Sequence, residues 1–179
     1  MPRWPAFADR RLHGGSAALR YFLDTEYNGT GGALLSLALV PDDGDDFYMT
    51  LRTDEPISEW VQKHVVPYMD MVPERLSCPR LTRSDAAQAL ERYLGHDDDP
   101  LIIADWPEDV AQFCSLMITG PGDMVELRHT TFLLTPMSNF STAANSKVPH
   151  NALHDARAFR DHVLSMESFA RLWIASSLR

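Results

Sequence analysis

The feature that most limits the fold is a pair of apolar segments near the start of the chain, joined by a glycine-rich turn. Residues 33–40 are almost wholly apolar, which is typical of a strand buried on both faces. Aromatic and aliphatic side chains at 20–23 predict a neighbouring strand, and the glycines at 28–32 predict the turn between the two. A second turn at 42–46 would return the chain into a strand at 47–51, so the sequence predicts a three-stranded meander.

The rest of the chain alternates predicted helices with short apolar strands. In order, the pattern predicts helices over 56–69 and 84–94, a strand over 101–104, a helix over 110–117, a strand within 124–134, a loop over 136–149 and a helix from 151 onward. The core candidates on the last helix are Ala156, Phe159, Val163, Met166 and Leu172. This order predicts an α/β architecture with helices around a mixed sheet.

Length and composition limit the class of protein. A chain of 179 residues is expected to form one domain, which we assign to residues 19–179, after a flexible extension over residues 1–18. No apolar run approaches the length of a membrane span, so no membrane partner is expected. Cys78 and Cys114 belong to no paired metal-binding spacing, which argues against zinc and favours a reducing, cytoplasmic location.

The net charge of −9 argues against a broad basic surface for sequence-independent binding of duplex nucleic acid. It is compatible with an enzyme acting on nucleic acid, because bound metal ions neutralise part of the acidic charge. A short substrate, or one held only at its end, needs few phosphate contacts. The charge therefore favours small or terminal substrates.

Three acidic segments fall at the ends of predicted elements, where they can converge at one edge of the sheet. Asp24 and Glu26 follow the first strand and, in an extended segment, would project to the same face. Asp105 and Asp109 flank the junction of a strand and a helix, and Asp155 lies in the first turns of the last helix. Carboxylate clusters bind Mg²⁺ or Mn²⁺, which neutralise phosphate and activate water. The pattern predicts a metal site for phosphodiester chemistry.

Each segment also has an ordinary structural explanation. Asp-x-Glu sequences are frequent in solvated turns, and Asp is a favoured cap at the start of a helix, as Asp105 would be. His150 is the candidate general base and His154 competes with it. His154 is adjacent to Asp155, however, and neighbouring side chains on a helix do not face each other. The joint occurrence of the three segments in this order outweighs the separate explanations.

The three segments resemble the motifs of the DEDDh exonucleases of the ribonuclease-H-like superfamily. The matching motifs are Phe22-Leu23-Asp24-Thr25-Glu26, Asp105-Trp106-Pro107-Glu108-Asp109 and His150-Asn151-Ala152-Leu153-His154-Asp155-Ala156. The resemblance covers about residues 19–175 and is strongest to the compact bacterial exoribonucleases. In the second motif, the family has an Asn followed four residues later by the catalytic Asp. Here Asp105 occupies the Asn position and Asp109 that of the catalytic Asp, so Asp109 is favoured and Asp105 is the alternative.

This resemblance implies a ribonuclease-H-like fold, with a mixed central sheet covered by helices on both faces. It also implies 3′–5′ exonuclease activity that releases nucleoside 5′-monophosphates with two Mg²⁺ ions, replaceable by Mn²⁺. Asp24, Glu26 and Asp155 are then expected to hold the first ion, and Asp24 also to reach the second. Asp109 is expected to act through metal-bound water, and His150 to take the proton from the attacking water.

Contacts to the substrate are predicted at Thr25, Tyr27, Trp106 and Phe140, of which the aromatic rings can stack on terminal bases. The expected substrate is single-stranded or 3′-overhanging RNA. A DNA exonuclease of the proofreading or repair type is an alternative, because no motif reads the 2′-hydroxyl group. A catalytically inactive nucleic-acid-binding module is a third interpretation. We also predict a homodimer with an interface near Trp60 or Trp173.

Overall fold

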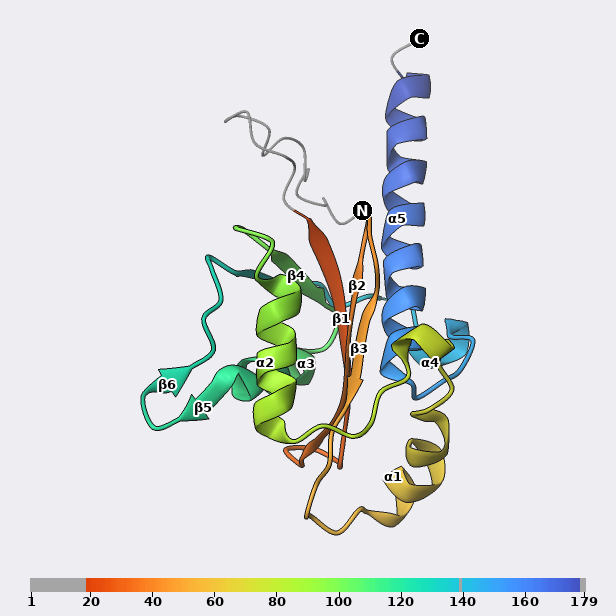
Figure 1. Ribbon diagram of the computed structural model, residues 1–179. Coiled ribbons are helices and arrows are strands. Elements are labelled where there is room, and N and C mark those ends of the chain that lie inside the picture. Colours follow the sequence, from red (N-terminus) through yellow and green to blue (C-terminus); the bar gives the residue numbers. More distant parts are fainter. Residues whose placement is uncertain (1–18, 139, 178–179) are drawn as a thin grey trace.

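A five-stranded mixed sheet forms the centre of the molecule (Figure 1). The computed structural model describes residues 19–138 and 140–177. The strands are β1 (Arg20–Tyr27), β2 (Leu34–Pro41), β3 (Phe47–Thr50), β4 (Leu101–Ala104) and β7 (Thr131–Leu134). They lie in the order β3-β2-β1-β4-β7, with antiparallel pairing from β3 to β1 and parallel pairing from β1 to β7. The predicted α/β class and mixed sheet are confirmed.

The first three strands form the predicted meander. β2 is buried at every position and pairs with β1 on one side and β3 on the other, which explains its apolar sequence. The turn between β1 and β2 contains Gly29 and Gly31 with φ of 75° and 71°. Residues other than glycine rarely adopt this left-handed backbone conformation. The two glycines therefore allow the tight connection between the strands.

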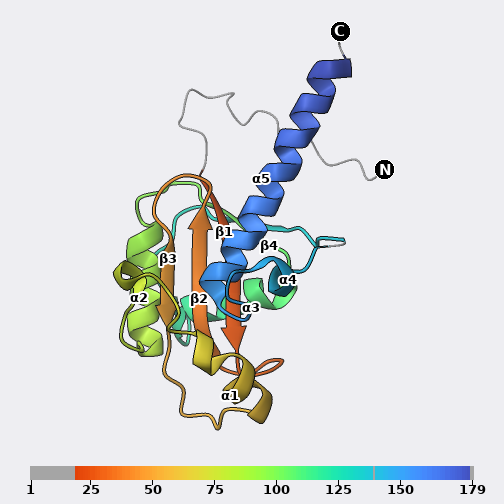
Figure 2. The same ribbon diagram turned by 90° about the vertical axis from the view of Figure 1, so that its right-hand side faces the viewer.

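Helices cover both faces of the sheet (Figures 1 and 2). On one face lie α2 (Arg83–Leu94) and α3 (Pro107–Met117), and on the other lies α5 (Ala152–Ser177). Successive residues of β1 point to opposite faces, so that Leu23 packs in the cluster with Leu90 and Phe113. Phe22 packs instead with Phe159, in an edge-to-face ring contact at 5.4 Å between centroids.

The predicted helix over 56–69 is shorter than expected. The chain forms α1 (Glu59–His64) and then a separate turn of 3₁₀ helix, η2 (Val66–Tyr68). Pro67 explains the break, because proline lacks the N–H that a continuous helix would bond to the carbonyl four residues earlier. A second 3₁₀ turn that was not predicted, η3 (Glu74–Leu76), follows.

The predicted strand within 124–134 forms only at the end of that segment, as β7. Its first residue belongs to a hairpin of β5 (Ile118–Gly120) and β6 (Asp123–Met124), and only β7 joins the main sheet. Gly122, with φ of 81°, allows the hairpin to turn tightly. The predicted loop over 136–149 contains one short helix, α4 (Thr142–Asn145).

The long helix α5 extends beyond the sheet (Figure 1). Val163 is still buried, whereas the exposed fractions of Met166 and Phe169 are 45% and 71%. The prediction that Met166 lies in the core is therefore wrong, because none of the described elements covers the helix there. The predicted flexible extension over residues 1–18, and the side chains of Leu172 and Trp173, lie outside the described part of the structure. Within the described part, no helix combines the length and apolar character needed to cross a membrane.

Candidate metal and catalytic site

Three of the predicted acids meet between β1 and the start of α5. Asp24 and Glu26 lie on the face of β1 that α5 covers, and Asp155 lies in the first turn of α5. One carboxylate oxygen of each residue lies within 4.8 Å of the others. Such spacing allows the three side chains to share one divalent cation.

The carboxylate of Asp155 is bonded on one side only. Its side chain is buried, with an exposed fraction of 4% for the residue. Its Oδ2 accepts a hydrogen bond from the backbone N–H of His150 at 3.1 Å, whereas its buried Oδ1 has no hydrogen-bond partner in the described structure. Leaving a buried carboxylate oxygen unpaired is costly, so the site fits a positively charged ligand at this position.

Asp109 lies in the first turn of α3 and is held by β1. Its Oδ1 accepts hydrogen bonds from the backbone N–H of Thr25 at 3.1 Å and from the Thr25 hydroxyl at 2.6 Å. Asp105 directly follows β4. After burial, the negative charges of Asp109 and Asp105 are among the causes that raise the pKa of Asp24. Both candidates for the second motif therefore lie beside Asp24, and hydrogen bonds to β1 fix Asp109. We call the five carboxylates at positions 24, 26, 105, 109 and 155 the acidic site.

Burial and mutual repulsion raise the pKa values across the acidic site. Burial, followed by the charges of Asp155 and Asp109, raises the pKa of Glu26 to about 8. Burial is also the main cause that raises the pKa of Asp109 to about 7 and that of Asp155 to about 6. Burial and four neighbouring carboxylates raise the pKa of Asp24 well above its ordinary value. The site therefore favours protons or metal ions as a source of positive charge.

The thermal stability of the metal-free protein is expected to fall as the pH rises. The raised pKa values mean that the folded chain binds these protons more tightly than the unfolded chain, whose carboxyl pKa values lie near 4. This contribution is complete below about pH 4 and is lost as the pH passes through the folded values of about 6 to about 8. The check is Tm measured in EDTA and in excess Mg²⁺ between about pH 5 and about pH 8.5. We expect a decrease in EDTA that Mg²⁺ largely removes, and equal pH slopes in both would contradict the metal site.

Replacing Thr25 with valine is expected to lower both stability and activity. The substitution keeps the side-chain shape but removes the hydroxyl donor to the buried Asp109. Loss of one hydrogen bond to a buried polar group costs about 1–3 kcal/mol, which chemical denaturation can measure. Thr25→Ser retains the hydroxyl and serves as the matched control. Equal stability of the two variants would contradict this role for the hydroxyl.

His150 stands at the edge of the acidic site. Its backbone φ is 61°, a conformation that is uncommon outside glycine. The next residue, Asn151, caps α5, because its side-chain oxygen accepts hydrogen bonds from the N–H groups of Leu153 and His154. The ring of His154 is engaged elsewhere, since its Nε2 lies 3.0 Å from the carbonyl oxygen of Met71. This difference favours His150 over His154 as the base.

The residues predicted to contact substrate lie in different surroundings. Tyr27 lies beside Asp109, whose charge is among the causes, after burial and Glu108, that raise the pKa of the Tyr27 hydroxyl. Trp106 precedes α3 and is 58% exposed. The hydroxyl of Thr25 is bonded to Asp109, and the ring of Phe140 stacks on His162 with centroids 4.2 Å apart. Tyr27 and Trp106 therefore remain predictions for base contacts, while Thr25 and Phe140 have structural partners.

The sequence did not indicate that Trp60 lies near the acidic site. From the sequence, Trp60 is expected only at a subunit interface. In the structure its ring contacts the ring of His150, with centroids 5.2 Å apart. Trp60 and His64 are four residues apart on α1, a spacing that predicts neighbouring rings on one helix face. Nothing in the sequence indicated that this pair lies beside His150.

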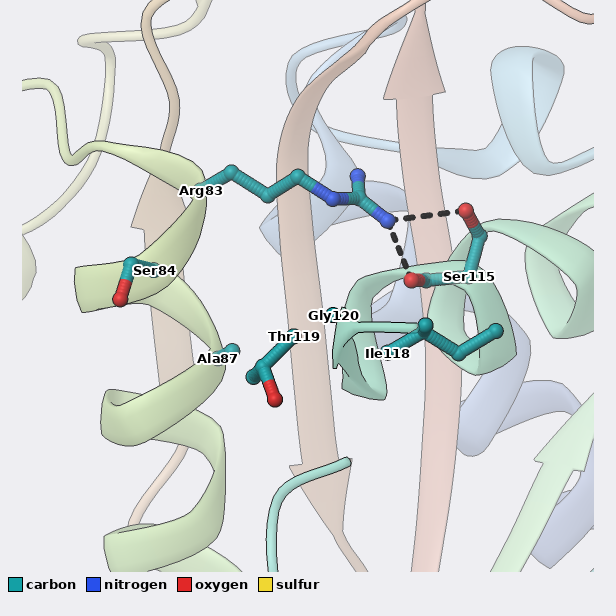
Figure 3. A pocket seen from close by; sticks show the side chains of 7 residues that line it. All are labelled: Arg83, Ser84, Ala87, Ser115, Ile118, Thr119 and Gly120. Atoms are coloured by element: carbon teal, nitrogen blue, oxygen red, sulfur yellow. Dashed lines mark hydrogen bonds between the residues drawn. The ribbon is translucent and has the colours of Figure 1, made fainter. Parts of the chain in front are cut away.

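A separate pocket of about 510 Å³ lies between α2 and the end of α3 (Figure 3). It is lined by Arg83, Ser84, Ala87, Ser115, Ile118, Thr119 and Gly120. The guanidinium group of Arg83 donates hydrogen bonds to the carbonyl oxygen and the hydroxyl of Ser115. None of the five carboxylates lines this pocket, so it is not part of the acidic site.

Comparison with known proteins assigns no family: no protein-family model matches the sequence, and no curated protein matches it. The functional inference therefore depends on the carboxylates of the acidic site and on His150. These residues come from three separate segments of the chain, on β1, around the start of α3 and at the start of α5.

Proposed function

We propose that the protein is a metal-dependent 3′–5′ exonuclease of the DEDDh class, acting on RNA. The observation that carries this proposal is the convergence of Asp24, Glu26 and Asp155 within 4.8 Å, with one oxygen of Asp155 left without a partner. The sheet order, an antiparallel meander continued by two parallel strands, supports a ribonuclease-H-like fold as part of the same proposal. Mg²⁺ is the proposed cofactor, with two ions per site and Mn²⁺ as a substitute.

The carboxylates divide into ligands and supporting groups in this proposal. Asp24, Glu26 and Asp155 would hold the first ion, and Asp24 would also serve the second. Asp109, fixed by Thr25, lies near Asp24 and would support the site through metal-bound water. The ions supply the positive charge that neutralises the phosphate and makes water acidic enough to attack at neutral pH.

His150 acts as the general base in this scheme. Water adds to the terminal phosphorus and gives its proton to the imidazole, while the bond from phosphorus to the 3′ oxygen of the preceding nucleotide breaks. The released 3′ oxygen takes up a proton from solvent, His150 returns its proton to solvent, and the product is a nucleoside 5′-monophosphate. The hydrogen bond from the backbone N–H of His150 to Asp155 supports this role, because it ties His150 to a proposed metal ligand.

The experiment is degradation of a 5′-labelled single-stranded RNA and of the matching DNA, with Mg²⁺, Mn²⁺ or EDTA. We expect a ladder that shortens from the 3′ end, requires a divalent ion and forms faster on RNA. Faster degradation of DNA would support the alternative of a proofreading or repair exonuclease. Binding without any metal-dependent product on either strand would contradict the enzyme and favour the inactive binding module.

Two further expectations accompany the proposal. Both cysteines, Cys78 and Cys114, carry free thiols, which suits the proposed cytoplasmic location. A homodimer is also proposed, and light scattering tests it. A monomeric mass at micromolar concentration would remove that expectation.

A further inference from the structure

An exposed tryptophan links α1 to the candidate base. Trp60 is 55% exposed, so burial in the core is not what this ring contributes. Its indole stacks on His64, one turn further along α1, with centroids 5.0 Å apart and planes inclined by 29°. It also meets the imidazole of His150 nearly at a right angle, with centroids 5.2 Å apart and planes inclined by 83°.

His150 has a fixed backbone but few restraints on its ring. Its N–H is bonded to Asp155, and the residue, with φ of 61°, directly precedes the Asn151 cap of α5. Among the described residues, the ring of Trp60 is the aromatic contact of the imidazole, and no hydrogen bond holds either ring nitrogen. Trp60 therefore contributes a ring contact that restricts rotation of the imidazole.

Trp60 is itself held in place by the surrounding fold. The neighbouring Val61 packs with Leu35 of β2, and Ser58 caps α1. The segment after α1 is tied to the first turn of α5, because the amide of Asn151 donates to the carbonyl of Tyr68 at 2.7 Å. The fold therefore sets the separation between the indole of Trp60 and the imidazole of His150.

We propose that Trp60 is a positioning residue for His150, one that holds the imidazole at the edge of the acidic site without touching the reacting atoms. The inference rests on the proposed function, since it assigns to His150 the role of base. His64 also stacks on the indole. Stacking of Trp60 on a substrate base is the rival role, and the two roles predict different kinetics.

A double-mutant cycle with Trp60→Ala and His150→Ala separates the two roles. If Trp60 acts through His150, Trp60→Ala lowers kcat by about 10- to 100-fold and leaves KM within about twofold. The same substitution in the His150→Ala background then causes no further loss. Trp60→Phe, which keeps a ring, is expected to recover most of kcat. Phe169→Ala, which removes an exposed ring from the far part of α5, serves as the unchanged control. A rise in KM alone, or an equal loss in both backgrounds, would overturn the proposal.

Nuclear magnetic resonance tests the positioning contact without any activity. The imidazole Cε1–H signal of His150 is assigned by its absence in His150→Ala, and the nearby indole should shift it through its ring current. We expect Trp60→Ala to move this signal and Phe169→Ala to leave it in place. An unmoved signal would overturn the positioning role even in an active enzyme. A moved signal in a protein without metal-dependent hydrolysis would remove the proposed function and leave the contact established.

Discussion

Replacing Asp155 with asparagine is expected to remove metal-dependent hydrolysis while making the metal-free protein more stable. The amide oxygen can still accept the hydrogen bond from His150, but the substitution removes one negative charge from a crowded, buried site. Loss of a ligand weakens the hold on the ion that would neutralise the phosphate, so we expect kcat to fall by roughly 10²–10³-fold. In EDTA, relief of repulsion should raise Tm, at about 2–4 °C for each kcal/mol gained. Oligonucleotide degradation and calorimetry measure the two effects.

Asp161→Asn is the matched control for this variant. Asp161 lies on the same helix, its side chain is 65% exposed and it pairs with Arg160. Its replacement should change neither kcat nor the difference in Tm between EDTA and Mg²⁺. The Asp155 variant, in contrast, should lose most of the increase in Tm that Mg²⁺ gives to the wild-type protein. Full retention of that increase would exclude Asp155 as a ligand.

Replacing His150 with alanine is expected to lower kcat by about 10²–10⁴-fold, the usual contribution of a general base. Binding of Mg²⁺ should persist, because the three carboxylates that come within 4.8 Å of one another do not include His150. The measurements are single-turnover hydrolysis and the Tm increase caused by Mg²⁺. A large loss of both would indicate that His150 holds the metal or the fold instead of moving a proton.

His154→Ala distinguishes the two candidate bases. The ring of His154 contacts the carbonyl of Met71, so its removal should affect stability and change kcat by less than about threefold. A larger loss of kcat in His154→Ala than in His150→Ala would reverse the assignment.

Much of the fold follows from local patterns in the sequence. The buried strand β2 and the amphipathic helices α2, α3 and α5 were predictable, because their apolar side chains recur with the period of the element. The errors have identifiable causes. Pro67 interrupts one periodic segment, and the hairpin of β5 and β6 is too short to show a period. Met166 keeps the core spacing of α5 after the sheet beneath it has ended.

The candidate site was predictable only in part. The types and spacing of Asp24, Glu26 and Asp155 indicated a shared cation, and the structure brings these three together. The bond between Thr25 and Asp109, and the ring contact between Trp60 and His150, join residues far apart in the chain. Such contacts depend on how strands and helices pack, which the local pattern of a single sequence does not record.

The acidic site joins three segments that are distant in the chain, and this arrangement affects the unfolding rate of the native state. Its side chains come from β1, from the start of α3 and from the first turn of α5, so they meet only after β4 has paired with β1 and α5 has docked. In the metal-free chain, repulsion among the carboxylates opposes that final docking. If these contacts form after the folding transition state, a cation that joins them should slow unfolding and leave the folding rate nearly unchanged, which stopped-flow kinetics with Mg²⁺ and with EDTA would test. The supply of divalent ions would then determine how long each folded molecule persists.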